Sequence, residues 1–367
     1  MQKNNVLWKK SIRILSLILV LSISSCPMSF GDIASMSSRE MIEYTTRGVR
    51  NARITVGIIQ NGQMSFTVYG ENGKVRPAIE HIYEIGSITK VFTAQLFAKA
   101  MSEGRVCNVC HDVVSLDCSI DHFLELSTKA YYPTIRRLLT HTSGYARSYY
   151  YGNLLPPQSV PFGSALNGIT RKMVLDRIGT INLENRDYQY SYSNVGIALV
   201  GLVLEEIYNK EFSSLMNEYL KNELGLNNTK VNDGSGDLSH YWILENGNPY
   251  IATGFLTSSI TDMLKFALMQ INIIPSYVGY TQNTLAEIIP RLTLPGFDFG
   301  FDSIGLGWHI DSLNSLIFHG GDTGNQHSCI IIDKTDNTAI VVLSNMSGNF
   351  RINGQLIGFA LLRELRG

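Results

Sequence analysis

The sequence lacks the signatures of several common enzyme classes. Its 367 residues contain no Gly-x-Ser-x-Gly elbow, no His-Glu-x-x-His pair and no phosphate-binding loop. The motifs of α/β-hydrolases, zinc proteases and nucleotide-binding enzymes are therefore missing. The formal net charge is only −1, which gives no reason to expect nucleic acid or an anionic membrane as a partner. With no repeat and no low-complexity stretch, the chain is long enough for two lobes with substantial cores.

Long apolar runs are also missing, except near the N-terminus. Residues 1–25 combine a basic start with an apolar stretch, Ile14 to Ile23, that is too short to span a bilayer and is typical of a secretory signal. The segment ends in Ile-Ser-Ser-Cys26, which resembles the lipobox of bacterial lipoproteins. We therefore expect export to the bacterial cell envelope (periplasm), with lipidation of Cys26 as the membrane anchor. Ordinary cleavage after Gly31, which would leave a soluble protein, is the alternative.

Cysteine is scarce, with five residues in the chain. Cys107-Asn108-Val109-Cys110-His111 matches the c-type haem attachment pattern, and zinc on Cys107, Cys110, His111 and Cys118 is a further alternative. A disulfide among Cys107, Cys110 and Cys118 is the favoured interpretation in an oxidising compartment. Cys329 lies in an apolar strand and is predicted to be a buried free thiol. The sequence therefore predicts no cofactor and no metal.

The most informative motif is Ser87-Ile88-Thr89-Lys90. Residues three apart on a helix share a face, so the Ser87 hydroxyl and the Lys90 amine can meet. A serine hydroxyl needs an adjacent base to act as a nucleophile, and a lysine serves as that base when burial or a neighbouring cation lowers its pKa. The residues that follow are apolar on most sides, which predicts a central, buried helix. A lysine at the start of such a buried helix indicates a catalytic role.

Two further motifs follow in the chain. Tyr192-Ser193-Asn194 precedes an apolar segment, and His319-Gly320-Gly321 follows a short extended run. A tyrosine hydroxyl can relay a proton, an asparagine can hold a substrate amide, and paired glycines let a strand approach a ligand closely. Each tripeptide alone is better explained as a helix cap or a turn. Together and in this order they indicate an active site.

The three motifs together resemble those of the serine β-lactamase and penicillin-binding-protein superfamily. The chain is most similar to the branch with class C β-lactamases, D-alanyl-D-alanine carboxypeptidases, D-aminopeptidases and related esterases. Further segments that resemble the sequences of this family extend over most of the chain, including Leu138–Gly144, Thr253–Ser258, Gly305–Trp308 and Ile340–Asn345.

The resemblance implies a role for each motif residue. Ser87 would be the acylated nucleophile, and Lys90 and Tyr192 would share the acid/base work, with the general base left open. The backbone N–H groups of Ser87 and Asp322 would form the oxyanion hole. The substrate would be held by Asn194, His319, Gly320 and Gly321.

Three departures from the family pattern concern substrate recognition. His319 replaces a lysine, so its charge is not permanent near neutral pH. Gly320 removes a threonine hydroxyl, and Asp322 puts an acidic side chain beside the presumed oxyanion hole. Among the other histidines, His141 is interpreted as structural at a helix end, whereas His309 and His327 could lie near the site.

The pattern of elements predicts an α+β fold of the β-lactamase/transpeptidase type. An antiparallel sheet built from both termini would be flanked by helices, with a mostly helical lobe inserted at 102–243 of a single domain, 36–367. A hairpin is expected around Asn61-Gly62. Helices are expected at Met36–Arg47 and Gln355–Leu365, and later strands at Gly305–Ile310, Leu316–His319, Ser328–Ile332 and Ala339–Leu343.

The expected function is that of an exported serine hydrolase working through an acyl-serine intermediate. The favoured substrate is the D-Ala-D-Ala-type stem peptide of peptidoglycan, cleaved by a carboxypeptidase or endopeptidase. An esterase or D-aminopeptidase is the nearest alternative, then a β-lactamase, then a non-catalytic β-lactam or wall-fragment binder. The sequence leaves the oligomeric state open.

Overall fold

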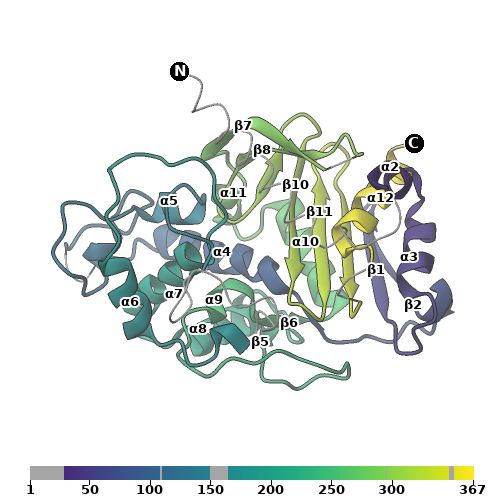
Figure 1. The fold of residues 1–367 in the computed structure, drawn as a ribbon, viewed down its shortest axis with the longest axis horizontal. Helices are drawn as coiled ribbons and strands as arrows, with labels where there is room; N and C mark the ends of the chain where they lie inside the picture. The colour runs from purple at the N-terminus through teal and green to yellow at the C-terminus, as the bar shows by residue number, and fades with distance from the viewer. Residues whose placement is uncertain (1–28, 108–109, 149–163, 295, 347–350) are drawn as a thin grey trace.

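The computed structural model describes residues 29–107, 110–148, 164–294, 296–346 and 351–367. They form a sheet half and a helical half that lie side by side along the molecule's long axis (Figure 1). The main sheet has nine strands, and every neighbouring pair is antiparallel. In spatial order the strands are β3 (Val75–Arg76), β2 (Gln63–Tyr69), β1 (Ile54–Gln60), β12 (Thr338–Ser344), β11 (His327–Asp333), β10 (Leu316–Asp322), β9 (His309–Asp311), β8 (Gly300–Ile304) and β7 (Ala286–Thr293). The predicted α+β class is confirmed.

Strands from both ends of the chain meet in the middle of this sheet. β1 pairs with the late strand β12, from Ile54 opposite Ser344 to Ile59 opposite Ala339. β1 also forms the predicted hairpin with β2, whose turn residues Asn61 and Gly62 have φ values of 52° and 75°. Two consecutive positive φ values characterise the tight turn that matches strand twist, which explains the Asn-Gly pair.

Helices cover both faces of the sheet. On one face lie α2 (Phe30–Ser35), α3 (Ser38–Thr46) and the C-terminal α12 (Gly354–Arg366), whose apolar residues share a core with alternate residues of β12 such as Ile340 and Val342. Of these helices α12 packs directly on β11 and β12, and α3 packs on α12. On the other face α10 (Ile260–Asn272) packs on β1, β11 and β12. Every residue of β12 is buried, because a strand covered on both faces needs an apolar run rather than alternation. The predicted terminal helices at Met36–Arg47 and Gln355–Leu365 correspond to α3 and α12.

The helical half surrounds α4 (Thr89–Ser102). Its residues from Thr89 to Ala100 are all buried, which confirms the predicted central helix. The other helices are α5 (Ile135–Leu139), α6 (Arg171–Gly179), α7 (Asn194–Tyr208), α8 (Phe212–Glu218), α9 (Ile251–Gly254) and α11 (Val278–Thr281). A small sheet joins β4 (Tyr83–Glu84), β6 (Leu256–Ser258) and β5 (Lys230–Val231). No helix among the described residues is long and apolar enough to cross a bilayer. The boundaries 36–367 and 102–243 stay predictions.

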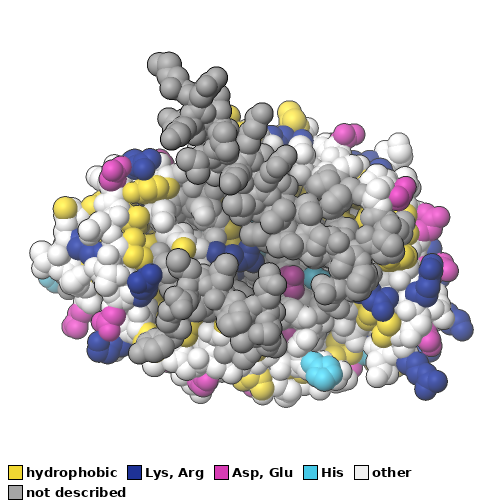
Figure 2. All heavy atoms as spheres, viewed as in Figure 1, with side chains coloured by type: hydrophobic (Ala, Val, Ile, Leu, Met, Phe, Trp, Pro, Cys, Tyr) yellow, Lys and Arg dark blue, Asp and Glu magenta, His cyan; other side chains and the backbone are white. Residues whose placement is uncertain are grey.

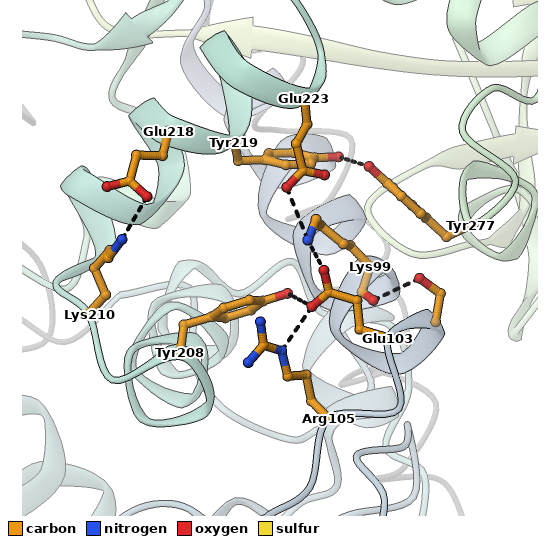
Figure 3. A network of polar contacts seen from close by, with 10 residues as sticks. Lys99, Glu103, Arg105, Tyr208, Lys210, Glu218, Tyr219, Glu223 and Tyr277 are labelled. Atoms are coloured by element: carbon orange, nitrogen blue, oxygen red, sulfur yellow. Dashed lines mark hydrogen bonds and ion pairs between the residues drawn. The ribbon is translucent and has the colours of Figure 1, made fainter.

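A polar network anchors the C-terminal end of α4 (Figure 3). Lys99 forms ion pairs with Glu103, one turn further on, and with Glu223 at 3.0 Å in the π-helical turn after α8. Glu103 also accepts hydrogen bonds from Tyr208 (3.0 Å) at the end of α7 and from Arg105 (2.9 Å). The network therefore holds the C-terminal end of the helix that carries Lys90 against two neighbouring helices.

One predicted strand is wrong. The segment predicted as one strand, Gly305–Ile310, contains the turn that joins β8 to β9 and then the first residues of β9. The chain reverses direction in this turn. Gly307 has a φ of +75°, which a strand residue cannot adopt, and Ile304 consequently pairs with His309 across the turn. The other late strands correspond to β10, β11 and β12, whereas β7 and β8 were not predicted.

The predicted disulfide is also wrong for this structure. No disulfide joins Cys107, Cys110 and Cys118. The Cys107 thiol donates instead to the carbonyl of His122 at 3.0 Å, and the Cys118 sulfur lies 3.4 Å from the hydroxyl of Ser115. No group of three potential metal ligands occurs in the described part of the chain, so the zinc alternative gains no support.

The buried thiol at Cys329 is confirmed. It is fully buried in β11, and burial raises its pKa. The predicted signal segment, 1–25, and Cys26 lie outside the described residues.

Candidate active site

The centre of the site is the turn that leads into α4. Ser87 lies in a 3-10 turn, Gly86–Ile88, immediately before the first residue of α4. Lys90, three residues on, donates a hydrogen bond from Nζ to the Ser87 hydroxyl at 3.0 Å. Ser87 is only partly buried, whereas Lys90 is fully enclosed. The spacing thus produces the predicted contact between an accessible hydroxyl and a sequestered amine.

The surroundings of Lys90 favour its neutral form. Burial lowers its pKa well below the ordinary value, and the positive charge of Arg147 lowers it further. Its Nζ also donates to the carbonyl oxygen of Thr253 at 2.5 Å, which fixes the amine beside Ser87. A neutral amine retains a lone pair, so Lys90 can accept the proton of the Ser87 hydroxyl.

Tyr192 stays protonated at neutral pH. Its ring centroid lies 4.9 Å from Lys90 Nζ, and Ser87 is among the groups that lower the pKa of its phenol. Burial raises the pKa of Tyr192 to about 12, although Ser87 and Arg147 oppose that rise. The lowered pKa of Lys90 therefore suits a general base, and the raised pKa of Tyr192 suits a proton donor, for chemistry at the Ser87 hydroxyl.

The end of β10 lies against the nucleophile turn. Gly86 has a φ of +51°, and an added Cβ there would lie only 2.6 Å from the backbone nitrogen of Asp322. An added Cβ at Gly321 would lie 2.1 Å from the carbonyl oxygen of Ile85. Neither position tolerates a side chain. These two glycines bring the backbone of Asp322 next to that of Ser87, as an oxyanion hole made by both requires.

Replacing Gly321 with alanine is expected to lower kcat by about 10²- to 10³-fold, because β10 must move away from the nucleophile turn and one oxyanion donor is lost. Overpacking should also lower the free energy of unfolding by about 1–3 kcal/mol. Steady-state hydrolysis and urea unfolding measure the two effects. Gly31→Ala is the matched control, since a Cβ there meets nothing closer than 3.7 Å. Undiminished kcat in Gly321→Ala would contradict this account of the oxyanion hole.

The third motif carries no positive charge. His319 is 2% exposed, and burial lowers its pKa well below the ordinary value, helped by His309 and Lys90. Its Nδ1 lies 2.7 Å from the carbonyl of Gly320, and its ring stacks on His309 with centroids 4.9 Å apart. His309 has its own pKa lowered to about 4 by burial and by Lys90. Both imidazoles are therefore neutral at pH 7.

The aromatic wall extends from these histidines to the second motif. The ring centroids of Tyr192 and His319 lie 6.4 Å apart, and the hydroxyl of Tyr190 lies 3.2 Å from Nε2 of His309. His309 thus lies near the site, as considered possible from the sequence. His327 lies beside Asp322, with its Nδ1 3.9 Å from the Asp322 carboxylate.

Hydrogen bonds clamp the second motif to the loop after α5. The backbone N–H of Asn194 donates to the carbonyl of Arg147 (2.8 Å), and its amide donates to the hydroxyl of Ser148 (3.3 Å). The Ser193 hydroxyl donates to the carbonyl of Ala146 (2.8 Å). This clamp positions Asn194 at the start of α7, close to Tyr192.

His141 has the structural role that was predicted. It follows α5 with a positive φ of 60°, and its Nδ1 accepts the backbone N–H of Ser193 at 3.1 Å. Its ring also lies 4.6 Å from that of Tyr192, measured between centroids. His141 therefore holds the Tyr-Ser-Asn motif in place.

A buried carboxylate that no sequence motif signals lies beside the site. Glu84, in β4, is 2% exposed, and burial raises its pKa. It accepts hydrogen bonds from Thr323 (2.5 Å), Asn232 (3.0 Å) and the backbone N–H of Trp242. Because Thr323 directly follows Asp322, Glu84 fixes the turn beyond Asp322.

Arg147 was not predicted either. Figure 2 shows exposed basic, acidic and histidine side chains near the middle of one face of the molecule. Arg147 is exposed, and its guanidinium carbon lies 5.4 Å from the ring centroid of Tyr192. No sequence spacing signals this contact, since Arg147 lies outside all three motifs.

The fold and the grouping of Ser87, Lys90 and Tyr192 define a member of the serine β-lactamase and penicillin-binding-protein superfamily. Within it, the chain belongs to the Beta-lactamase family, whose model matches residues 40–360. The members of this family are serine hydrolases. The family and superfamily expected from the motifs are thereby confirmed.

Individual relatives are distant. "Protein flp" of Staphylococcus aureus (strain MRSA252) is 24% identical over 313 residues, covering 80% of this chain and 59% of that protein. A "Beta-lactamase" of Providencia stuartii is 26% identical over 231 residues, covering 61% and 54% of the two chains. The chain thus spans about three fifths or less of these curated relatives.

Solved structures support the fold. A "Beta-lactamase/D-alanine Carboxypeptidase" from Yersinia pestis matches with a TM-score of 0.68 and 19% identity, over 92% of this chain and 99% of that one. An octameric penicillin-binding protein homologue from Pyrococcus abyssi matches with a TM-score of 0.67 and 22% identity, over 93% of this chain and 78% of that one. At such identities the likeness establishes the fold alone.

Proposed function

We propose that the chain is a D-alanyl-D-alanine-type peptidase that cleaves peptidoglycan stem peptides through an acyl-Ser87 intermediate. The observation that carries acyl transfer is the 3.0 Å hydrogen bond between Ser87 and the buried Lys90. Two structural neighbours, from Yersinia pestis and Pseudomonas syringae, are each described as a "Beta-lactamase/D-alanine Carboxypeptidase", a description that includes this substrate class. The neutral third motif argues against a specialised β-lactamase, since a lysine there would attract a carboxylate permanently.

The proposed reaction begins with transfer of the Ser87 proton to neutral Lys90. The serine oxygen attacks the scissile carbonyl carbon, and the backbone N–H groups of Ser87 and Asp322 stabilise the resulting oxyanion. The C–N bond then breaks, and Tyr192 protonates the leaving amine while taking up the proton held by Lys90. Water attacks the acyl-enzyme with the same groups acting in reverse, which releases the acid and restores Ser87.

Location is part of the proposal. The signal-like segment 1–25 and the lipobox-like Cys26 would place the domain in the cell envelope, where stem peptides occur. The membrane would then be contacted only through the lipid anchor.

The test is release of D-alanine from an N-acylated peptide ending in D-Ala-D-Ala, together with intact mass after treatment with a fluorescent penicillin. We expect D-alanine release and a long-lived penicillin adduct on Ser87. Fast penicillin hydrolysis without a persistent adduct would indicate a β-lactamase instead. Turnover of simple esters without D-alanine release would indicate an esterase, and either result would overturn the proposed substrate.

A further inference from the structure

The site contains one permanent cation that the three motifs do not supply. His319 and His309 are both neutral at pH 7, and burial favours the neutral form of Lys90. Arg147 is always charged, because a guanidinium is not deprotonated in proteins. Its charge lowers the pKa values of Lys90, His141 and Tyr192, so it acts directly on the catalytic cluster.

The backbone of Arg147 is held firmly although its side chain is exposed. Its carbonyl accepts the backbone N–H of Asn194 at 2.8 Å. On either side, the carbonyl of Ala146 accepts from Ser193 (2.8 Å), and the hydroxyl of Ser148 accepts from Asn194 (3.3 Å). Three successive residues are thus bound to the Tyr-Ser-Asn motif, which fixes the base of the side chain relative to Tyr192.

The guanidinium is available to an anion. Among the described residues, Arg147 forms no ion pair with any carboxylate. Its guanidinium stacks over the Tyr192 ring, with 5.4 Å between the guanidinium carbon and the ring centroid. A stacked guanidinium keeps the N–H groups at its edge available, and that edge matches a carboxylate bidentately.

We infer that Arg147 binds the free carboxylate of the substrate's leaving residue. In the proposed reaction Tyr192 protonates the leaving nitrogen, and Arg147 is the cation stacked on that same tyrosine. In a C-terminal D-amino acid the carboxylate is separated from the leaving nitrogen by a single carbon. Arg147 would therefore supply the charge that the third motif lacks. This inference rests on the proposed function and selects carboxypeptidase over endopeptidase action, because an internal bond has no adjacent free carboxylate.

The test uses two thioesters of the same N-acyl-D-alanine. One has thioglycolate as leaving group, with a carboxylate, and the other has the uncharged thioglycolamide. Thiol release is followed in both cases, so the assay works whether or not peptides are cleaved. We expect Arg147→Gln to lower the ratio of kcat/KM, carboxylate over amide, by about 10- to 100-fold, mainly through KM. Arg147→Lys should keep part of the preference.

The matched control is Arg186→Gln. Arg186 is also stacked on a tyrosine, with 4.2 Å between its guanidinium carbon and the Tyr188 ring centroid, but it is paired with Glu184. The preference for the carboxylate should persist in this control. An unchanged ratio in Arg147→Gln, or an equal fall for both thioesters, would overturn the inference. Failure of the proposed function is separate, because it appears as absence of D-alanine release from peptides by the wild type.

Discussion

Ser87→Ala is expected to lower kcat/KM by about 10⁴- to 10⁶-fold, the range that loss of a catalytic serine produces in other serine hydrolases. The hydroxyl is the only proposed acyl acceptor, and the Lys90 base would have no proton to remove. The substitution should change stability little, because Ser87 is only partly buried and its removal creates a small gap. Thioester hydrolysis, thermal unfolding and intact mass after penicillin treatment measure rate, fold and adduct.

Ser191→Ala is a suitable control for Ser87→Ala. Ser191 is exposed and immediately precedes Tyr192, so it tests for general disturbance of the second motif. We expect it to retain turnover and the penicillin adduct. Retained hydrolysis in Ser87→Ala, above the contamination shown by a mock purification, would rule out the acyl-serine mechanism.

The centre of the site was predictable because it depends on local spacing. Ser87 and Lys90 lie three residues apart at the start of a helix, so their contact follows from helix geometry alone. Tyr192 and His319 were identified by resemblance, since nothing in their spacing fixes a contact across so much chain. The structure brings the Tyr192 ring centroid to 4.9 Å from Lys90 Nζ and the His319 ring centroid to 6.4 Å from that of Tyr192, while their chemical roles stay predictions.

What the sequence did not reveal depends on packing between distant segments. Glu84 contacts Asn232, Trp242 and Thr323, and its sequence neighbours carry no sign of these partners. Arg147 reaches the site only because three hydrogen bonds clamp its loop to the second motif. Such contacts depend on tertiary structure, and local residue patterns in a single sequence do not reveal them.

The mistaken elements have local explanations. The prediction of a strand at Gly305–Ile310 did not account for Gly307, whose positive φ turns the chain between β8 and β9. The expected disulfide was inferred from compartment and spacing, whereas the structure gives the Cys107 thiol a hydrogen bond to the carbonyl of His122. The hairpin at Asn61-Gly62 succeeded because that dipeptide itself requires the turn conformation.

Lys90→Met should lower kcat/KM by about 10²- to 10⁴-fold, the usual worth of a positioned general base. Wild-type activity should rise with pH along an acidic limb, because raising the pH removes the proton that prevents Lys90 from acting as a base. The limb should lie far below the ordinary lysine range, since burial and Arg147 both lower the pKa of Lys90. Rates against pH with the neutral thioester measure this limb.

Assignment of the acidic limb needs variants of every charged or titratable group that faces Lys90. Those groups are Arg147, Tyr192, His141, His309 and His319. Arg147→Gln removes a positive charge, so it should raise the pKa of Lys90 and move the limb to higher pH. His319→Asn should keep the limb, because His319 transfers no proton in the proposed reaction. If the limb disappeared in His319→Asn and was unmoved in Arg147→Gln, the histidine rather than the lysine would be the group whose proton controls acylation.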